Sequence, residues 1–210
     1  MIVRSLNVGG PATYQYEGKE VTTAFFKFPV AGPLFLSKTG FPGDEQVDMV
    51  HHGGPEKAAL LYSEEHSAYW ARELGHDPGP AAMGETLTVS GIDEAGAHIG
   101  DVYTIGEATV QVCQPRVPCY KANIRHGIPD MVRRVQACGF TGFYVRVLTE
   151  GNIHVGDAIT LVSRIEGNPT VAELNHLVYH DQSNRAALER CAEAEGLAEV
   201  WRNWLRKLLG

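Results

Sequence analysis

Short apolar runs rich in β-branched and aromatic residues alternate with glycine and proline clusters through the first 164 residues. Runs of this kind predict strands. The candidates cover residues 2–8, 21–28, 86–89, 102–105, 108–114, 143–148 and 158–162. Because no regular helices separate them, a doubly wound parallel sheet is disfavoured. A closed or nearly closed β-barrel fits better, since closure removes exposed strand edges. The predicted fold class is therefore mainly β, with a few short helices.

Two helices are expected within this strand-rich region. One opens at Ser63, a good N-cap followed by two acidic residues, and stops before Gly75. The other opens at Pro129 and Asp130 and stops before Gly139. Both follow long loops that contain glycine.

The pattern becomes helical after Gly167 and Pro169, and no strand candidate remains. We therefore predict a boundary near residue 165, with a barrel domain over 1–164 and a small three-helix bundle over 165–210. A bundle of this size is marginal alone, so we expect it to lean on the barrel or on a partner.

Capping residues mark the helices of this tail. Thr170 and Glu173 form a capping box for the first helix, and Ser183 or Asn184 opens a second helix that ends at Gly196. The last helix carries an apolar stripe made of Leu197, Trp201, Trp204, Leu205 and Leu208. Such a stripe belongs to a core more often than to an interface.

Composition narrows the possible classes of function. The formal net charge is −7, which argues against a general nucleic-acid or acidic-membrane binder. No segment reads as a signal peptide or a bilayer span, so a cytoplasmic protein is expected. The four cysteines show no CxxC pairing, and neither a zinc site nor a disulfide framework is indicated.

The segment around Cys119 departs from the acidic average. Between positions 114 and 134 a single acid faces five basic residues, Arg116, Lys121, Arg125, Arg133 and Arg134. Nearby positive charge favours the thiolate form of Cys119, which attacks electrophiles or binds metals. Pro115 and Pro118 restrict the backbone on either side. A buried, inert thiol is the alternative at this point.

A second unusual segment is the histidine–glycine loop HHGGPEK. His51 and His52 precede Gly53 and Gly54, so imidazoles and bare backbone N–H groups can approach a ligand together. Lys57 adds positive charge, which suits a phosphate or another oxyanion. A tight turn with surface histidines is the equally weighted alternative.

Two Gly-Asp pairs, at 100–101 and 156–157, each precede a strand. This pattern is typical of turns between barrel strands, so Asp101 and Asp157 are expected to be structural. No GxSxG elbow or catalytic carboxylate pair is present in the sequence.

Taken in order and spacing, several motifs resemble the MOSC domain family, named for the molybdenum cofactor sulfurase C-terminal region. They are GDEQVD, HHGGPEKA, MGETLTVSGID, IGDVYTIGEATVQVCQPRVPCYK, GFTGFYVRVLTEG and VGDAITLV. More narrowly, the chain is similar to the stand-alone bacterial YiiM-like subfamily, in which a three-helix domain follows the barrel. The resemblance covers nearly the whole chain.

The resemblance implies a molybdenum cofactor (molybdopterin), with Cys119 of the PRxPC motif as the thiolate ligand of the metal. Cys119 and His52 take the catalytic roles, His52 as a polar contact or proton relay. The expected cofactor-binding residues are Cys119, His52, Gly53, Gly54, Lys57, Thr86, Arg116, Lys121 and Arg125, the cations meeting the phosphate. Thr86 stands where many relatives carry Asn.

The family likeness also implies an activity. Members of this kind are molybdenum-cofactor-dependent oxidoreductases, independent of pyridoxal phosphate, that detoxify N-hydroxylated compounds such as 6-hydroxylaminopurine by reducing them to the amine. By similarity, a flavoprotein reductase donates the electrons, and we hypothesise that the helical tail docks it. No nucleic-acid or membrane partner is expected, and a homodimer stays open.

Two other classes of function remain. Cys119 in a sulfur relay would carry a persulfide, and no molybdenum would bind. In a non-catalytic cofactor-binding or interaction module, Trp201 and Trp204 would form a partner surface, and the biological role would survive Cys119→Ser.

Overall fold

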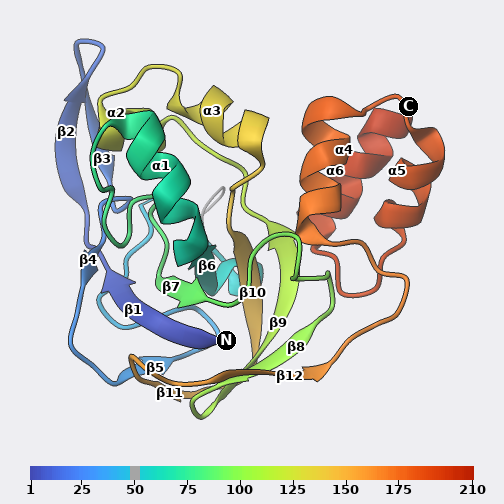
Figure 1. Cartoon of the computed structure of the whole chain (residues 1–210), viewed down its shortest axis with the longest axis horizontal. Coiled ribbons are helices and arrows are strands. Elements are labelled where there is room, and N and C mark those ends of the chain that lie inside the picture. The colour runs from blue at the N-terminus through green and yellow to red at the C-terminus, as the bar shows by residue number, and fades with distance from the viewer. Residues whose placement is uncertain (48–52) are drawn as a thin grey trace.

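The computed structural model describes residues 1–47 and 53–210. Its main sheet has eight strands in the order β12-β8-β9-β10-β6-β7-β1-β4 (Figure 1). These strands are β1 (Ile2–Val8), β4 (Phe28–Pro29), β6 (Ala59–Ser63), β7 (Leu87–Ser90), β8 (Val102–Ile105), β9 (Ala108–Pro115), β10 (Phe143–Thr149) and β12 (Ile159–Ser163). The smaller pairs are β2 (Ala12–Tyr16) with β3 (Lys19–Thr23), and β5 (Leu34–Leu36) with β11 (Gly151–Ile153). The pairing of β6 with β7 is parallel, and the other pairings are antiparallel.

The sheet curls so that β1 forms hydrogen bonds with the segment that leads into β12. Val3 N donates to Asp157 O at 3.0 Å, and Gly156 N donates to Val3 O at 2.9 Å. Ile159 N donates to Met1 O at 3.0 Å. The mainly β fold class with several helices and a helical tail is therefore confirmed.

Most predicted strands match the observed ones, but the candidate over 21–28 is not one strand: its first three residues belong to β3, its last residue belongs to β4, and residues 24–27 are not strand. Strand β3 ends at Thr23, whose Oγ1 accepts from Phe25 N at 3.1 Å and so diverts the chain from the ladder. The strand that sequence reasoning missed most clearly is β6, which lies between β10 and β7. All five of its residues are buried, so it shows no alternation of polar and apolar positions.

The helices inside the β region begin later than predicted. Residues Glu64–His66 form a 3-10 turn (η2), and α1 covers Ser67–Leu74, with Gly75 in the left-handed region as expected. Helix α3 covers Met131–Cys138 and also ends at its predicted glycine. A short helix α2 (Lys121–His126) and the 3-10 turn η1 (Pro55–Lys57) were not expected.

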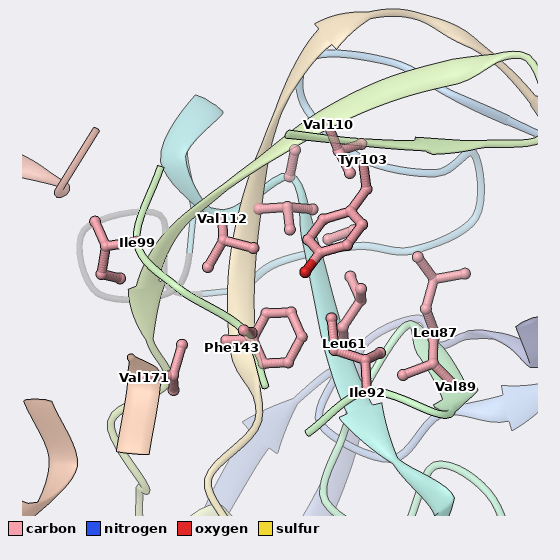
Figure 2. Close-up of a cluster of buried hydrophobic side chains, with 14 of the residues drawn as sticks. Leu61, Leu87, Val89, Ile92, Ile99, Tyr103, Val110, Val112, Phe143 and Val171 are labelled. Atoms are coloured by element: carbon pink, nitrogen blue, oxygen red, sulfur yellow. The ribbon is translucent and has the colours of Figure 1, made fainter. Parts of the chain in front are cut away.

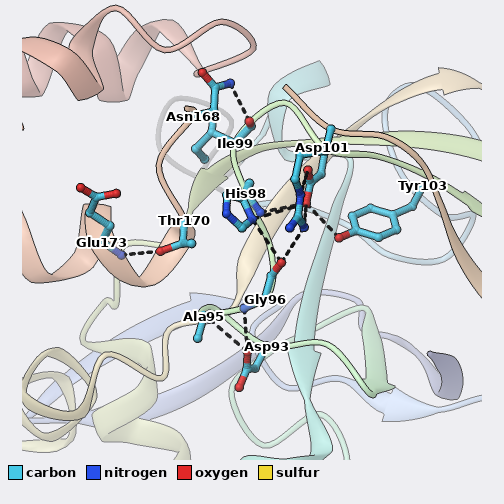
Figure 3. Close-up of polar contacts among 11 residues, drawn as sticks. Asp93, Ala95, Gly96, His98, Ile99, Asp101, Tyr103, Asn168, Thr170 and Glu173 are labelled. Carbon is cyan, nitrogen blue, oxygen red and sulfur yellow. Dashed lines mark hydrogen bonds and ion pairs between the residues drawn. The ribbon is translucent and has the colours of Figure 1, made fainter. Parts of the chain in front are cut away.

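The tail consists of α4 (Val171–His180), α5 (Arg185–Ala192) and α6 (Glu199–Leu209). Thr170 Oγ1 accepts from Glu173 N at 3.0 Å, as the capping box predicts (Figure 3). Asn184 caps α5, which ends at Ala192 and so falls short of the predicted end at Gly196.

One hydrophobic core joins the sheet to the tail. Phe143, Tyr103 and Val112 from the strands are buried in the same cluster as Val171 of α4 (Figure 2). Trp201 of α6 belongs to it as well, so the apolar stripe of the last helix packs inward. The tail therefore packs against the sheet, as expected. In the described part of the chain, no helix has the length and apolarity needed to cross a bilayer.

Candidate functional site

A pocket opens where β3, the loop before η1, the starts of β7 and α2, and strand β10 come together. Its described lining residues are Thr23, Ala24, Phe25, Lys27, Asp44, Glu45, Gln46, Val47, Lys57, Ala58, Leu60, Gly84, Thr86, Lys121 and Tyr144. Three of these are lysines and two are acids. The pocket therefore combines apolar walls with a concentration of positive charge, as small-molecule sites often do.

Lys27 and Asp44 form a buried ion pair in the pocket wall. Their side chains are 9% and 3% exposed, and Lys27 Nζ bonds to Asp44 Oδ1. The same oxygen accepts from Gly9 N at 3.3 Å. Burial raises the pKa of the Asp44 carboxyl above its ordinary value, although the Lys27 ammonium opposes this shift.

Arg116 presents an unsatisfied donor. It is 3% exposed, and its Nη2 donates to Met83 O at 3.2 Å, but its buried Nη1 has no hydrogen-bond partner within the described structure. The guanidinium carbon stands 5.5 Å from the ring centroid of Phe25, which lines the pocket. Unpaired buried donors are rare, and a missing ligand is one explanation for a donor that lies next to a pocket.

Cys119 lies in the loop between β9 and α2. It is a free, half-buried cysteine, and its carbonyl accepts from Ala122 N at 3.0 Å at the start of α2. Burial raises the pKa of Tyr144 to about 12, with Arg116 lowering it and Cys119 raising it further. Tyr144 lines the pocket, and so does Lys121, which follows Cys119 by two residues in the sequence.

The other cysteines are less available. Cys113 is buried, its Sγ donates to Glu56 O at 3.1 Å, and burial raises the pKa of its thiol to about 12. Cys191 is also buried, which agrees with a core role. Cys138 is half-buried rather than fully in the core.

Thr86 lines the pocket, and Gly53 and Gly54 belong to the loop that leads to Lys57 of the pocket. Thr86 Oγ1 donates to Leu60 O at 3.1 Å and accepts from Leu60 N at 2.8 Å, so its hydroxyl ties β6 to the approach to β7. Gly54 has a φ of 100°, and a Cβ there would meet open space. Its carbonyl accepts from Lys57 N at 3.0 Å, and Gly53 directly precedes it.

Of the predicted site residues, Lys57, Thr86 and Lys121 line the pocket. The predicted residues that are described but are not among its lining residues are Cys119, Gly53, Gly54, Arg116 and Arg125. The Arg125 guanidinium lies 5.1 Å from the ring centroid of Phe26 and 6.0 Å from that of Phe28. His52, like His51, lies outside the described residues. The assignment of these residues to the site stays a prediction.

Sequence reasoning gave no role to Lys27 and Asp44. Lys27 is a single cation in the apolar segment TAFFKFPV, and its burial is the signal that could have marked it. Asp44 belongs to the GDEQVD motif, one of the motifs that carry the resemblance to the MOSC domain family.

The side chains available at this site suit a metal that takes most of its ligands from an organic cofactor and only one from the protein. Among residues 1–47 and 53–210, no cluster of three or more His, Cys, Asp or Glu side chains could hold a metal ion. A single soft sulfur at Cys119 is a suitable protein ligand for such a metal. The unsatisfied Arg116 Nη1 and the lysines of the pocket suit a phosphorylated cofactor. These residues therefore fit a molybdenum–pterin group.

Comparisons with known proteins define the class first. The MOSC domain model matches residues 48–160, and the YiiM-like, 3-alpha helix domain model matches residues 169–209. The chain therefore belongs to the MOSC domain family and carries the YiiM-like tail, and the predicted resemblance is confirmed. MOSC domains are generally a molybdenum-cofactor-binding family.

Particular relatives agree with this assignment. The chain is 44% identical over 200 residues to Uncharacterized protein YflK of Bacillus subtilis, with 95% of this chain and 90% of that protein covered. The crystal structure of YiiM from Geobacillus stearothermophilus matches with a TM-score of 0.84 at 36% identity, covering 99% of this chain and all of that one.

A third relative points to enzyme-like activity in the family. A protein named Reductase, from Gibberella moniliformis, is 37% identical over 151 residues, which are 70% of this chain and 27% of that protein. The chain thus spans about a quarter of this relative.

Proposed function

We propose that this protein is a molybdenum-cofactor-dependent reductase that converts N-hydroxylated compounds, such as 6-hydroxylaminopurine and related base analogues, to the amine. The observation that carries the proposal is a half-buried Cys119 in the loop that leads to Lys121 of the pocket, together with the unsatisfied Nη1 of Arg116, whose guanidinium lies over Phe25 in the pocket wall. The relative named Reductase supports the class of reaction.

Cys119 would bind the metal, while Arg116, Lys57 and Lys121 would hold the cofactor's phosphate. The Gly54 backbone, which has no side chain to fill the space above it, allows close approach of a ligand. When bound, the cofactor supplies the two-electron chemistry that removes oxygen from nitrogen.

The chain itself shapes the place where the substrate lies. Phe25, Leu60 and Ala58 give the pocket an apolar portion of its wall, and burial raises the pKa of Tyr144 to about 12, so its hydroxyl remains a hydrogen-bond donor even at alkaline pH. Such a wall suits a planar heterocycle, and Tyr144 can hydrogen-bond to it.

A flavoprotein reductase is the electron donor in this proposal. The tail remains the candidate docking element, but its removal is a poor test. Val171 and Trp201 share the core with the sheet, so truncation before Ile165 exposes buried apolar surface.

The test is the molybdenum and pterin content of wild-type and Cys119→Ser protein, purified from a host that makes the cofactor. Turnover of 6-hydroxylaminopurine with a chemical electron donor is then measured. We expect near-stoichiometric molybdenum and turnover in the wild type, with both lost in Cys119→Ser. Cys138→Ser is the matched control, because Cys138 is also half-buried but lies at the end of α3, in a different segment from the Cys119 loop. Wild type that stays free of cofactor and carries a persulfide on Cys119 would favour the sulfur relay.

A further inference from the structure

The reduction of an N-hydroxyl group consumes protons as well as electrons. R–NHOH, two electrons and two protons give R–NH2 and one water, so the N–O bond breaks and the departing oxygen leaves as water. The electrons come from the flavoprotein or the chemical donor. The protons must reach the substrate inside a pocket that has both apolar and charged lining residues. Proton transfer by a positioned side chain is worth about 10²–10⁴-fold in rate.

Asp44 and Lys27 are placed to supply such a proton. Both line the pocket, yet their side chains are almost completely buried, and they contact each other directly. Replacing a buried ion pair by apolar residues is often neutral or stabilising, so stability alone is weak grounds for such a pair. A buried ion pair that also lines the proposed substrate pocket is therefore a candidate for a functional role.

We propose that the Asp44–Lys27 pair delivers one of the two protons to the oxygen that leaves the substrate. This inference rests on the proposed function and adds a residue pair to it. In the protonated form of Asp44, the proton passes from its carboxyl to the leaving oxygen, which leaves the Asp44 carboxylate paired with the Lys27 ammonium. The Lys27 ammonium bonded to Asp44 then returns a proton to the carboxylate, and solvent at the pocket mouth recharges Lys27. The second proton comes directly from solvent.

Several charged and titratable groups face this pair. Lys57 approaches from η1, Lys121 from α2, Tyr144 from β10 and Glu45 from the loop that holds Asp44. The Lys27 ammonium and the hydrogen bond from Gly9 N favour the ionised form of Asp44, whereas burial favours the protonated form. Burial is the largest cause of the net shift, which raises the pKa of Asp44. A carboxyl whose pKa is raised holds its proton over a wider range of pH.

The experiment compares Asp44→Asn, Asp44→Glu and wild type, each checked for full molybdenum content, with 6-hydroxylaminopurine and a chemical electron donor. We expect Asp44→Asn to lower kcat by about 10²-fold or more with little change in KM. The fall of kcat at high pH, where Asp44 has lost its proton, should disappear in this variant. Asp44→Glu should restore part of kcat together with that fall. Asp130→Asn is the matched control, because Asp130 pairs with Arg134 at the surface.

Lys27→Met keeps the test decisive if Asp44→Asn does not fold. Because Lys27 lowers the pKa of Asp44 and returns its proton, the loss of Lys27 should lower kcat and move the fall of kcat to higher pH. An unchanged pH profile in Lys27→Met overturns the proposal. So does a fully loaded Asp44→Asn enzyme with kcat close to the wild-type value, or with an equal loss at every pH. A wild type that binds cofactor but never reduces the substrate instead overturns the proposed function itself.

Discussion

Arg164 holds Asp101 through two parallel hydrogen bonds, from Nε to Oδ1 at 2.8 Å and from Nη2 to Oδ2 at 2.6 Å. The Asp101 side chain is completely buried, whereas that of Arg164 is 35% exposed. Asp101 Oδ2 also accepts from Tyr103 OH at 3.0 Å and from His98 N at 2.9 Å (Figure 3). This carboxylate therefore ties the start of β8 to the segment that leads from β12 into the tail.

Replacing Asp101 by Asn should destabilise the fold by about 2–4 kcal/mol, because an amide offers one acceptor oxygen and turns its NH2 group toward a cation or a donor. Urea unfolding measures the loss. Asp157→Asn is the control in the second Gly-Asp turn. Its carboxylate is 25% exposed and accepts from His154 N at 2.7 Å, so a smaller loss is expected. Equal losses at the two positions would contradict this argument.

The fold and the site were predictable to different degrees. Strands with alternating burial, such as β8, and helices with local caps, such as α4, were found because their signals lie within a few residues. Strand β6 was missed because burial on both faces removes the alternation. The Cys119 loop was marked by local charge. Asp44 and Lys27 are 17 residues apart in the chain and lie outside the strands, so no local sequence pattern indicates that they pair.

Gly142 and Gly127 provide a second stability test. Both have positive φ, 72° and 65°, so an alanine is strained at either position. A Cβ at Gly142 would lie 2.6 Å from Leu61 O, in the backbone of β6, whereas a Cβ at Gly127 meets open space. We expect Gly127→Ala to cost about 1 kcal/mol and Gly142→Ala about 3 kcal/mol or more. Thermal or urea unfolding measures the loss of stability in each variant. Similar losses in the two variants would show that β6 moves aside at no cost in folding free energy.

The cysteines should differ in reactivity toward iodoacetamide in cofactor-free protein. With pKa values raised to about 12 and about 11, Cys113 and Cys191 are thiolates in only about 1 in 10⁴ and 1 in 10³ molecules at about pH 8. Both are also buried, while Cys119 is half-buried. Peptide mass spectrometry over time should find Cys119 labelled first. Labelling in urea is the control, since all the cysteines then react alike. Early modification of Cys113 would contradict its placement.

Glu85 should make stability depend on pH. It is 1% exposed, and its carboxylate accepts from Ala81 N, Met83 N and Thr88 Oγ1. Burial raises its pKa in the folded state, so the stability that the protonated form contributes is present below the unfolded pKa and is lost as pH rises through the folded value. The wild type should therefore lose stability relative to Glu85→Gln between about pH 4 and pH 7. Urea unfolding of both proteins across this range measures the difference, and a wild type that gains on the variant as pH rises would show that the hydrogen bonds outweigh burial.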